Sequence, residues 1–520
     1  VQRQQALHPF RFGVTRFRAP PFLRSVRSAH QSFAEPFVIW AFAGLAALLL
    51  GVLVVRRRAN RIALQAIRRS RSRVDRFKLT KKAAIRETLL ADQAIAAAVK
   101  EHADEFSTGE RAAWQRVEEY IDEIVPFFNI LTYYKVGLVV SKALLSFFYK
   151  VSAEYAGKDS SEVLPRDAIV IYLMNHRSNA DYLLVGYVLS GRVAISYAVG
   201  EWARTFPLEY IFKSFGAYFI RRKYREKLYH VVLERYVQLI TRNGVTQGIF
   251  LEGGLSRDGK LGKAKIGLLD YVLGVARDPA MRRRVYIVPV AINYDRVLED
   301  RSLLRELEAR EGRGRTPLHL QLGEVLRYVW WNMARLVARK WKRYGRAAVV
   351  VGEPFPIEPW LNEQDRETGG LFEIARADRL ARVQLLSDSV LERIAAIVPV
   401  TPVTLACAAL QSFDGDFISH KQLLSRMMEM REVLQELNAR VIHREGTVDD
   451  IFDRAWRMLR MRRILVRVGE GYAILPTNRP LISYYANSVS HLLGPFARGI
   501  RERDRLPALE NRLSVWPKVN

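Results

Sequence analysis

Cysteine is almost absent from this sequence of 520 residues, which contains only Cys407. A single cysteine excludes an intramolecular disulfide, and it also excludes cysteine-based zinc sites and redox motifs. A reducing, cytosolic environment is therefore the default. Cys407 lies in the apolar run 403–410, so we expect a packed hydrophobic side chain and not a nucleophile. Internal repeats are also lacking, which argues against a repeat architecture.

Acidic residues are scarce relative to basic ones, with 54 Asp and Glu against 82 Lys and Arg, a formal net charge of +28. Such an excess implies an anionic partner: nucleic acid, an anionic membrane surface, a phosphorylated substrate or an acidic protein. The hydrophobic fraction of 49% is that of a folded protein and excludes wholesale disorder. The length allows two to four domains.

Charged residues are missing from 37–55, a stretch that would span about 28 Å as a helix. Three arginines, 56–58, follow it directly. We therefore expect a basic N-terminal arm at 1–36 and a transmembrane helix at 37–55, with the main body on the cytoplasmic side of the cell (inner) membrane. A buried core helix or an interfacial hairpin is the alternative, whereas a cleaved signal peptide fits poorly.

The region 56–152 is predicted to be helical. Its last part, 130–151, is apolar but interrupted by Lys135 and Lys142. This pattern is typical either of an amphipathic helix that lies on lipid or of a packed core helix.

Short apolar strands alternate with helices over 153–358, which predicts an α/β domain with a mixed sheet flanked by helices. An inserted helix at 323–344 carries three tryptophans among basic residues, so it suits either an anionic membrane interface or ordinary packing. The expected strands are 168–174, 194–199, 217–220, 247–251, 285–292 and 347–352.

The C-terminal region 359–495 is expected to be mainly helical, with a basic tail at 496–520. Helices are predicted near 403–410, 420–437 and 448–459, and a hairpin joins 464–468 to 472–475 around Gly469-Glu470-Gly471. Three helices followed by a hairpin make a winged-helix-like module, which binds DNA in some proteins and only packs in others.

One histidine stands out because an aspartate follows it by five positions. Of the nine histidines only His176 has this spacing, to Asp181, in the stretch Asn-His-Arg-Ser-Asn-Ala-Asp at 175–181. An imidazole takes a proton from a hydroxyl, and a carboxylate fixes its tautomer and stabilises the imidazolium. A predicted strand precedes His176 and a predicted helix follows Asp181, so the pair is expected at a strand-to-helix turn. The spacing alone is a weak signal.

Three further blocks follow downstream. Gly216–Arg222 ends in two arginines after a predicted strand, and guanidinium groups bind phosphate bidentately. Glu252–Lys260 combines glycines with Ser256, Arg257 and Lys260, which suits anion binding. Val288–Asp295 is a strand that could wall a pocket. Taken alone, the first block is more often a solvated basic run, the second could be a plain turn, and the third could be an ordinary core strand.

Together, the four ordered blocks resemble the glycerolipid acyltransferases, and most of all the membrane-bound glycerol-3-phosphate acyltransferases. His176–Tyr182 is similar to the first block of that family, and the other three blocks follow in the same order. Further on, Tyr484-Tyr485-Ala486-Asn487-Ser488 with His491 is similar to a segment of the large bacterial members. One departure is Leu255, where the family often has arginine after the two glycines. Lys260, Lys263 or Lys265 could supply the missing charge.

The resemblance implies a glycerolipid acyltransferase fold that transfers a fatty acyl group from acyl-coenzyme A or acyl carrier protein to the sn-1 hydroxyl of glycerol 3-phosphate. It implies His176 as base and Asp181 as its partner, with no metal or cofactor. Glu252 is expected to fix the loop or an arginine. The implied substrate-binding residues are Arg221, Arg222, Glu252, Gly253, Ser256, Arg257 and Lys260. The expected pocket wall consists of Phe219, Ile220, Pro289 and Tyr294.

Two alternatives remain open at this point. A sister enzyme would use the same base on dihydroxyacetone phosphate or lysophosphatidate. A membrane-tethered winged-helix DNA-binding protein would use the arginines before the hairpin, among them Arg454, Arg457 and Arg460. That second reading leaves the four ordered blocks unexplained, so no nucleic-acid partner is expected, whereas anionic membrane lipid is.

Overall fold

The structure is a computed structural model. It describes residues 75–128, 138–157, 164–165, 167–190, 193–204, 208–221, 224–278, 281, 283–310 and 343–497. The predicted arm 1–36, the predicted transmembrane helix 37–55, nearly all of the predicted helix 323–344 and most of the tail 496–520 lie outside these residues. In the part of the chain that is described, no helix is long and apolar enough to cross a membrane.

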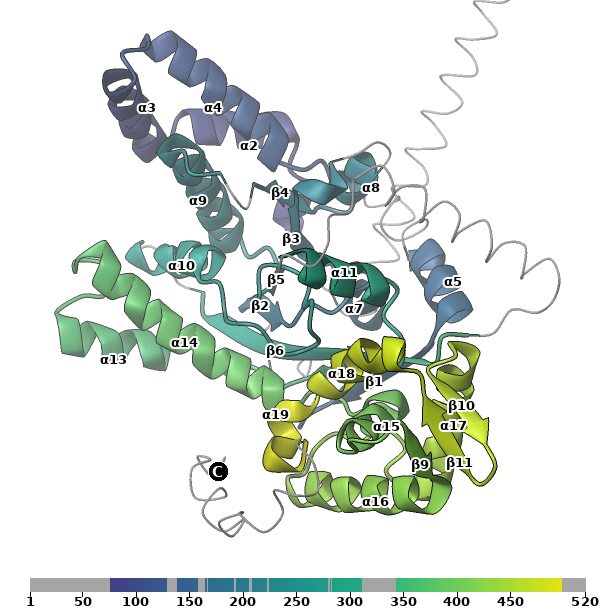
Figure 1. Ribbon diagram of the computed structural model, residues 1–520. Helices are drawn as coiled ribbons and strands as arrows, with labels where there is room; N and C mark the ends of the chain where they lie inside the picture. The colour runs from purple at the N-terminus through teal and green to yellow at the C-terminus, as the bar shows by residue number, and fades with distance from the viewer. Residues whose placement is uncertain are drawn as a thin grey trace, which may run out of the picture. The chain divides into compact units, whose positions relative to one another are not determined.

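A mixed eight-stranded sheet forms the centre of the α/β domain, with the strand order β1-β7-β6-β2-β5-β3-β4 and β8 paired to β6 (Figure 1). Parallel pairing links β6, β2, β5, β3 and β4 in turn, whereas β7 runs antiparallel to β6. The strands are β1 Lys150–Tyr155, β2 Ile169–Met174, β3 Ser196–Gly200, β4 Tyr218–Ile220, β5 Gln247–Phe250, β6 Val285–Tyr294, β7 Arg346–Val351 and β8 Phe355–Pro356.

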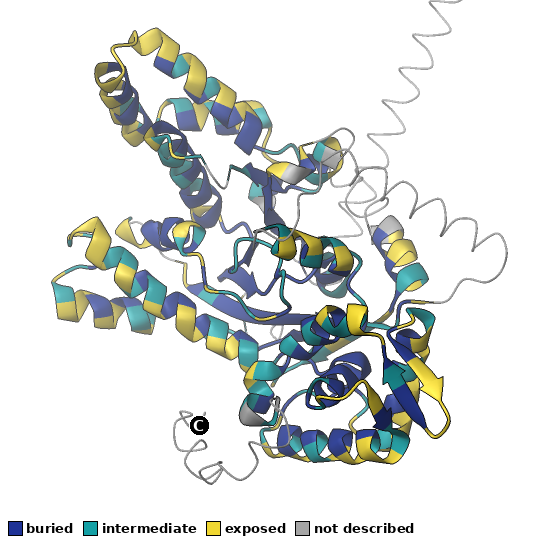
Figure 2. Ribbon diagram, viewed as in Figure 1, coloured by how far each residue is buried: buried dark blue, intermediate teal, exposed yellow. Residues whose placement is uncertain are grey.

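The strand β2 is buried on both faces because both faces of the sheet are covered by helices. Its odd-numbered residues, Ile169 among them, join a core with α3, α4, α9, α10 and α14. Its even-numbered residues, such as Met174, join a second core with α5, α7, α15 and α18. The alternation follows from the period of two in a strand. Figure 2 shows the strands largely buried, with exposed residues on the outer faces of the helices.

The helices of the described chain surround this sheet and continue beyond it. They are α2 Lys82–Leu90, α3 Gln93–Glu105, α4 Glu110–Ile124, α5 Leu138–Phe148, α7 Asp181–Leu189, α8 Leu208–Ser214, α9 Lys227–Arg242, α10 Gly267–Leu273, α11 Asp300–Arg310, α13 Glu358–Thr368, α14 Arg376–Ala396, α15 Pro402–Gln411, α16 His420–Glu436, α17 Val448–Met461, α18 Arg479–Asn487 and α19 Ser490–Leu493.

The C-terminal module, residues 402–493, follows the predicted order closely. Helices α15, α16 and α17 pack together, and β9 (Phe417–Ser419), β10 (Leu465–Val468) and β11 (Gly471–Ile474) form a three-stranded antiparallel sheet. Capping boxes start α16 at Ser419 and α17 at Thr447. Gly469 takes a positive φ of 54° in the hairpin turn, which glycine adopts without strain. Helix α18 packs against α15 and also reaches α11 of the α/β domain.

One prediction on the secondary structure was wrong. The helical region expected up to residue 152 ends at Phe148, and β1 (Lys150–Tyr155) then pairs in parallel with β7. This strand is an edge strand in which Lys150 and Ala153 are exposed and no residue is fully buried, and it follows an apolar helix almost directly. Its hydrophobic signal is therefore weak and merges with that of α5. All six expected strands are present, with ends shifted by at most two residues.

Candidate active site

The expected hydrogen bond between His176 and Asp181 is present. His176 lies two residues after the end of β2, and Asp181 is the first residue of α7. The distance from His176 Nδ1 to Asp181 Oδ2 is 2.9 Å, and the two side chains are 1% and 0% exposed. Because a carboxylate can only accept here, Nδ1 carries the proton and Nε2 is left as the proton acceptor. This is the arrangement of a general base.

The Asp181 carboxylate is held by more than the imidazole. Its Oδ2 atom also accepts the backbone N–H groups of Arg177 (2.7 Å) and Ser178 (3.0 Å). Its Oδ1 atom accepts the hydroxyl of Tyr294 at 2.6 Å. Burial raises the pKa of Tyr294 well above its usual value, so the phenol stays protonated and donates. Tyr294, expected in a pocket wall, thus orients the partner of the base.

The His176 ring is fixed by aromatic side chains. It stacks on Phe250 with ring centroids 3.9 Å apart, and Tyr182 meets it edge-on at 5.5 Å. Phe250 ends β5, the strand beside β2, so two adjacent strand ends hold the imidazole. A locked rotamer is what a base needs to keep its productive geometry.

Glu252 ties the loop after β5 to the turn after β2. Its Oε1 atom accepts the His176 backbone N–H at 2.9 Å, and its Oε2 atom accepts that of Gly262 at 2.7 Å. The carbonyl of His176 in turn accepts the N–H of Ser256 at 3.1 Å. Burial raises the pKa of Glu252 to about 7. These contacts are those of a positioning residue, the loop-fixing role expected from the sequence.

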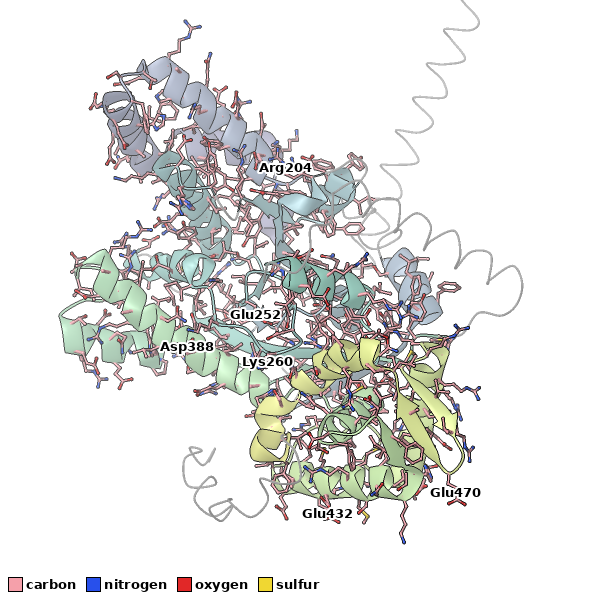
Figure 3. All side chains as sticks on the ribbon, viewed as in Figure 1. Arg204, Glu252, Lys260, Asp388, Glu432 and Glu470 are labelled. Atoms are coloured by element: carbon pink, nitrogen blue, oxygen red, sulfur yellow. The ribbon has the colours of Figure 1, made fainter. Side chains whose placement is uncertain are left out.

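The remaining residues of this loop are held by local contacts. Gly253 has a φ of +64°, which favours glycine. The Ser256 hydroxyl donates to the carbonyl of Lys260 at 2.7 Å, and Arg257 forms an ion pair with Glu306 on α11 at 2.9 Å. Lys260 is exposed. Figure 3 labels Glu252 and Lys260 on this loop.

Arg221 follows β4, three strands from β2 and about 14 Å away at the usual strand spacing. Its guanidinium forms a bidentate pair with Glu123 of α4, at 2.9 and 2.6 Å. Arg204 pairs with the same carboxylate, and Figure 3 places Arg204 well apart from Glu252 and Lys260. The expected phosphate-binding role of Arg221 stays a prediction.

The other expected residues take ordinary positions in the fold. Phe219 is fully buried and Ile220 is half-buried, both on β4. Pro289 sits inside β6 opposite Leu173, where its carbonyl accepts the N–H of Gly352. Arg222 lies outside the described residues. The structure therefore brings His176, Asp181, Glu252, Ser256 and Tyr294 together.

Two contributors to the site were not predicted. Asn175 pairs its side-chain amide with both backbone groups of Ile292 and so extends the β2–β6 pairing to the turn. Glu299 accepts the Ser178 hydroxyl at 2.7 Å and the Asn179 N–H at 3.2 Å, and burial raises its pKa. Asn175 immediately precedes the histidine and could have been found from the sequence. Glu299 is 121 residues from Ser178 and carries no local signal.

Glu252→Gln is expected to change how stability depends on pH. The folded state holds the Glu252 proton with a pKa of about 7, whereas the usual value is 4.5. Stability from that proton is therefore fully present below about pH 4.5 and is lost as the pH rises to about 7. Across this window the Tm of the wild type should fall relative to that of the variant. Parallel Tm profiles would contradict the raised pKa.

Arg257→Ala is expected to raise the KM for a phosphorylated acceptor about tenfold with little change in kcat, if the resemblance assigns its role correctly. Its ion pair with Glu306 is largely exposed, so the Tm should hardly move. Arg382→Ala is a matched control, because Arg382 forms a similar exposed pair with Glu367. Equal KM values in both variants would remove Arg257 from the phosphate site.

The fold and the His176–Asp181 geometry are those expected of an acyltransferase, and residues 158–293 match the sequence model of the family described as Acyltransferase. Residues 330–497 match the model described as Glycerol-3-phosphate acyltransferase C-terminal region. These two matches lie side by side along the chain, in the order that the sequence resemblance requires.

Curated relatives point the same way. The glycerol-3-phosphate acyltransferase of Baumannia cicadellinicola is 27% identical over 424 residues, covering 78% of this chain and 49% of the relative. Those of Xylella fastidiosa strain M23 and Glaesserella parasuis are 27% and 28% identical, covering 84% and 78% of this chain. The resemblance to glycerol-3-phosphate acyltransferases is thereby confirmed. The chain spans about half the length of the curated relatives it matches.

Among solved structures, the 1-acyl-sn-glycerophosphate acyltransferase of Thermotoga maritima is similar at 18% sequence identity. The match covers 50% of this chain and 78% of that protein, with a TM-score of 0.28. At that score the similarity carries no argument about the site.

Proposed function

We propose that the chain transfers a fatty acyl group from a thioester to the sn-1 hydroxyl of glycerol 3-phosphate, giving lysophosphatidate. The observation that carries this proposal is the buried His176–Asp181 pair with its Nε2 atom left as an acceptor. The family match at 158–293 supports acyl transfer, and the match at 330–497 supports glycerol 3-phosphate as the acceptor. The acyl donor is acyl-coenzyme A or acyl carrier protein thioester.

In the proposed reaction, His176 Nε2 takes the proton of the acceptor hydroxyl as that oxygen attacks the thioester carbonyl carbon. Asp181 stabilises the imidazolium through Nδ1–H. The carbon–sulfur bond then breaks, and the imidazolium returns its proton to the leaving thiolate. No acyl-enzyme is required. Cys407 is fully buried on α15, and burial raises its pKa, so its thiol is not a nucleophile.

We propose that the protein is held at the inner membrane by 37–55, with the catalytic domain on the cytoplasmic side. The net charge of +28 supports attraction to anionic lipid and to phosphorylated substrates. Deletion of residues 1–58 tests the anchor, because the shortened protein should no longer sediment with washed membranes. Continued sedimentation would contradict the anchoring role.

We propose that the C-terminal module, winged-helix-like in its order of elements, packs on the α/β domain and does not bind DNA. Arg462, which follows α17, is buried and forms an ion pair with Asp300 of α11 at 2.5 Å. Tyr485 donates to the same carboxylate and accepts from Arg462. Arg462 is therefore not available to DNA phosphates, and its ion pair joins the module to the α/β domain. A salt-sensitive gel shift with random DNA would support the DNA-binding alternative instead.

The acceptor class is tested by comparing kcat/KM for glycerol 3-phosphate, dihydroxyacetone phosphate and lysophosphatidate on the purified full chain. Each acceptor is assayed with acyl-coenzyme A and, separately, with acyl carrier protein thioester. We expect the largest kcat/KM for glycerol 3-phosphate. A clear preference for dihydroxyacetone phosphate or lysophosphatidate would contradict the proposed acceptor, while the proposed acyl transfer would still stand.

A further inference from the structure

Arg177 is a buried cation next to the proposed base. Its side chain is 2% exposed, and within the described residues no carboxylate lies at ion-pair distance from it. Its Nη1 atom donates to the carbonyl of Gly259, and its guanidinium lies over the Tyr484 ring, 4.9 Å from the centroid. An isolated buried charge is unfavourable unless it is paired.

The part of Arg177 that lacks a partner is one edge of the guanidinium. Both Nε and Nη2 are buried without a hydrogen-bond partner in the described structure. These two N–H groups point the same way and are spaced to match two oxygens of one phosphate or carboxylate group. Because Nη1 and the ring face are already engaged, the orientation of this edge is fixed in advance.

The surroundings of Arg177 connect it to the acceptor loop. The charged or titratable groups that its charge affects are Glu252, Tyr484 and His491. Glu252 is engaged by two backbone N–H groups and does not pair with Arg177. Where the family often carries arginine, Leu255 packs instead against the apolar core. Arg177, a cation from the block 176–182, is available in place of that arginine.

Helix α18 covers this loop from the C-terminal side. Asn487 donates its side-chain N–H to the carbonyl of Asp258 at 2.8 Å. Gly259, with a φ of +87°, is so close to the Tyr484 carbonyl that a Cβ there would collide with it. The loop that covers Arg177 thus begins near one positive-φ glycine, Gly253, and ends near another. Because Nε and Nη2 of Arg177 are buried, a ligand can bind this edge only if the loop 253–259 shifts.

We propose that the Nε/Nη2 edge of Arg177 binds a phosphate monoester during the reaction. The phosphate belongs either to the acceptor or to the 3′-phosphate of a coenzyme A donor. The inference rests on the proposed function, since it deepens the account of the same site. Arg177 thereby provides the positive charge that is missing at Leu255, where the family often has arginine.

The test is Arg177→Lys in the full-length protein, because lysine keeps the charge and loses the two-donor edge. We expect the KM for glycerol 3-phosphate to rise about 10- to 100-fold, with a smaller change in kcat. If the donor phosphate is bound instead, the KM for acyl-coenzyme A rises, and that for the thioester lacking the 3′-phosphate does not. Arg426→Lys is the matched control, because Arg426 is 4% exposed and donates to Ser412 and Glu429 within the C-terminal module.

A second measurement separates binding from turnover. Glycerol 3-phosphate and inorganic phosphate should raise the Tm of the wild type and of Arg426→Lys, and not that of Arg177→Lys. If the lysine variant does not fold, Arg177→Gln carries the same test without a buried charge. Unchanged KM values and unchanged phosphate protection in a folded Arg177 variant would overturn the inference. Phosphate protection that depends on Arg177 without any acyl transfer would overturn the proposed function alone.

Discussion

His176→Ala is expected to lower kcat by about 10²- to 10⁴-fold while the protein stays folded. The imidazole is the only group in the described site with a free proton acceptor beside a buried carboxylate. Without it the acceptor hydroxyl must lose its proton to water. Purified variant and wild type should be compared by steady-state assay at saturating acceptor and donor.

His230→Ala is the matched control. His230 is also partly buried and hydrogen-bonded, to Tyr271 and to the carbonyl of Tyr224, but it lies on α9 and these hydrogen bonds do not involve the turn of His176 or the loop after β5. We expect it to retain most of the wild-type kcat. Near-normal turnover by His176→Ala, or an equal loss in both variants, would remove His176 as the base.

Asp181→Asn is expected to have the second-largest effect, about a 10²- to 10⁴-fold loss of kcat. The amide oxygen of asparagine can take the place of Oδ2 and accept the three N–H groups, but it carries no negative charge to stabilise the imidazolium, and its NH2 group then faces the Tyr294 hydroxyl. The position is fully buried, so we also expect a lower Tm.

Tyr294→Phe tests whether the loss of kcat in Asp181→Asn comes from the lost charge or from a disturbed carboxylate position. It removes one donor to Oδ1 and leaves the His176 contact in place, so kcat should fall only a few-fold. The pH profile of kcat/KM is the readout, because weaker support of the carboxylate shifts the profile of the base. Equal kcat values for Asp181→Asn and Tyr294→Phe would contradict the assignment of Asp181.

The centre of the sheet was predictable from the sequence because its strands are continuous apolar runs. The run 168–174 lies between Asp167 and Asn175 and contains no charged residue, a pattern typical of a strand buried on both faces. Lys150–Tyr155 was missed because an edge strand buries little apolar surface and gives little periodicity. The order of the strands in the sheet could not be predicted, because it depends on pairing between residues far apart in the sequence.

The same distinction applies to the site, where contacts between residues close in the sequence were predictable and contacts between distant residues were not. His176 and Asp181 were found because a turn of five residues brings them together, and a short spacing is visible in one sequence. The pairing of Arg221 with Glu123, 98 residues away, was not predicted, and the contact of Arg177 with Tyr484 was not predicted either. Such contacts depend on how distant elements pack. Tyr294 shows the intermediate case, since its block was identified and its hydrogen bond to Asp181 was not.

The most direct test of the central claim is product formation by the purified full chain. Radiolabelled glycerol 3-phosphate is incubated with acyl-coenzyme A and, separately, with acyl carrier protein thioester. The account predicts labelled lysophosphatidate with at least one donor, and its loss in His176→Ala. Folded wild-type protein that forms no labelled lysophosphatidate with either donor would contradict the account.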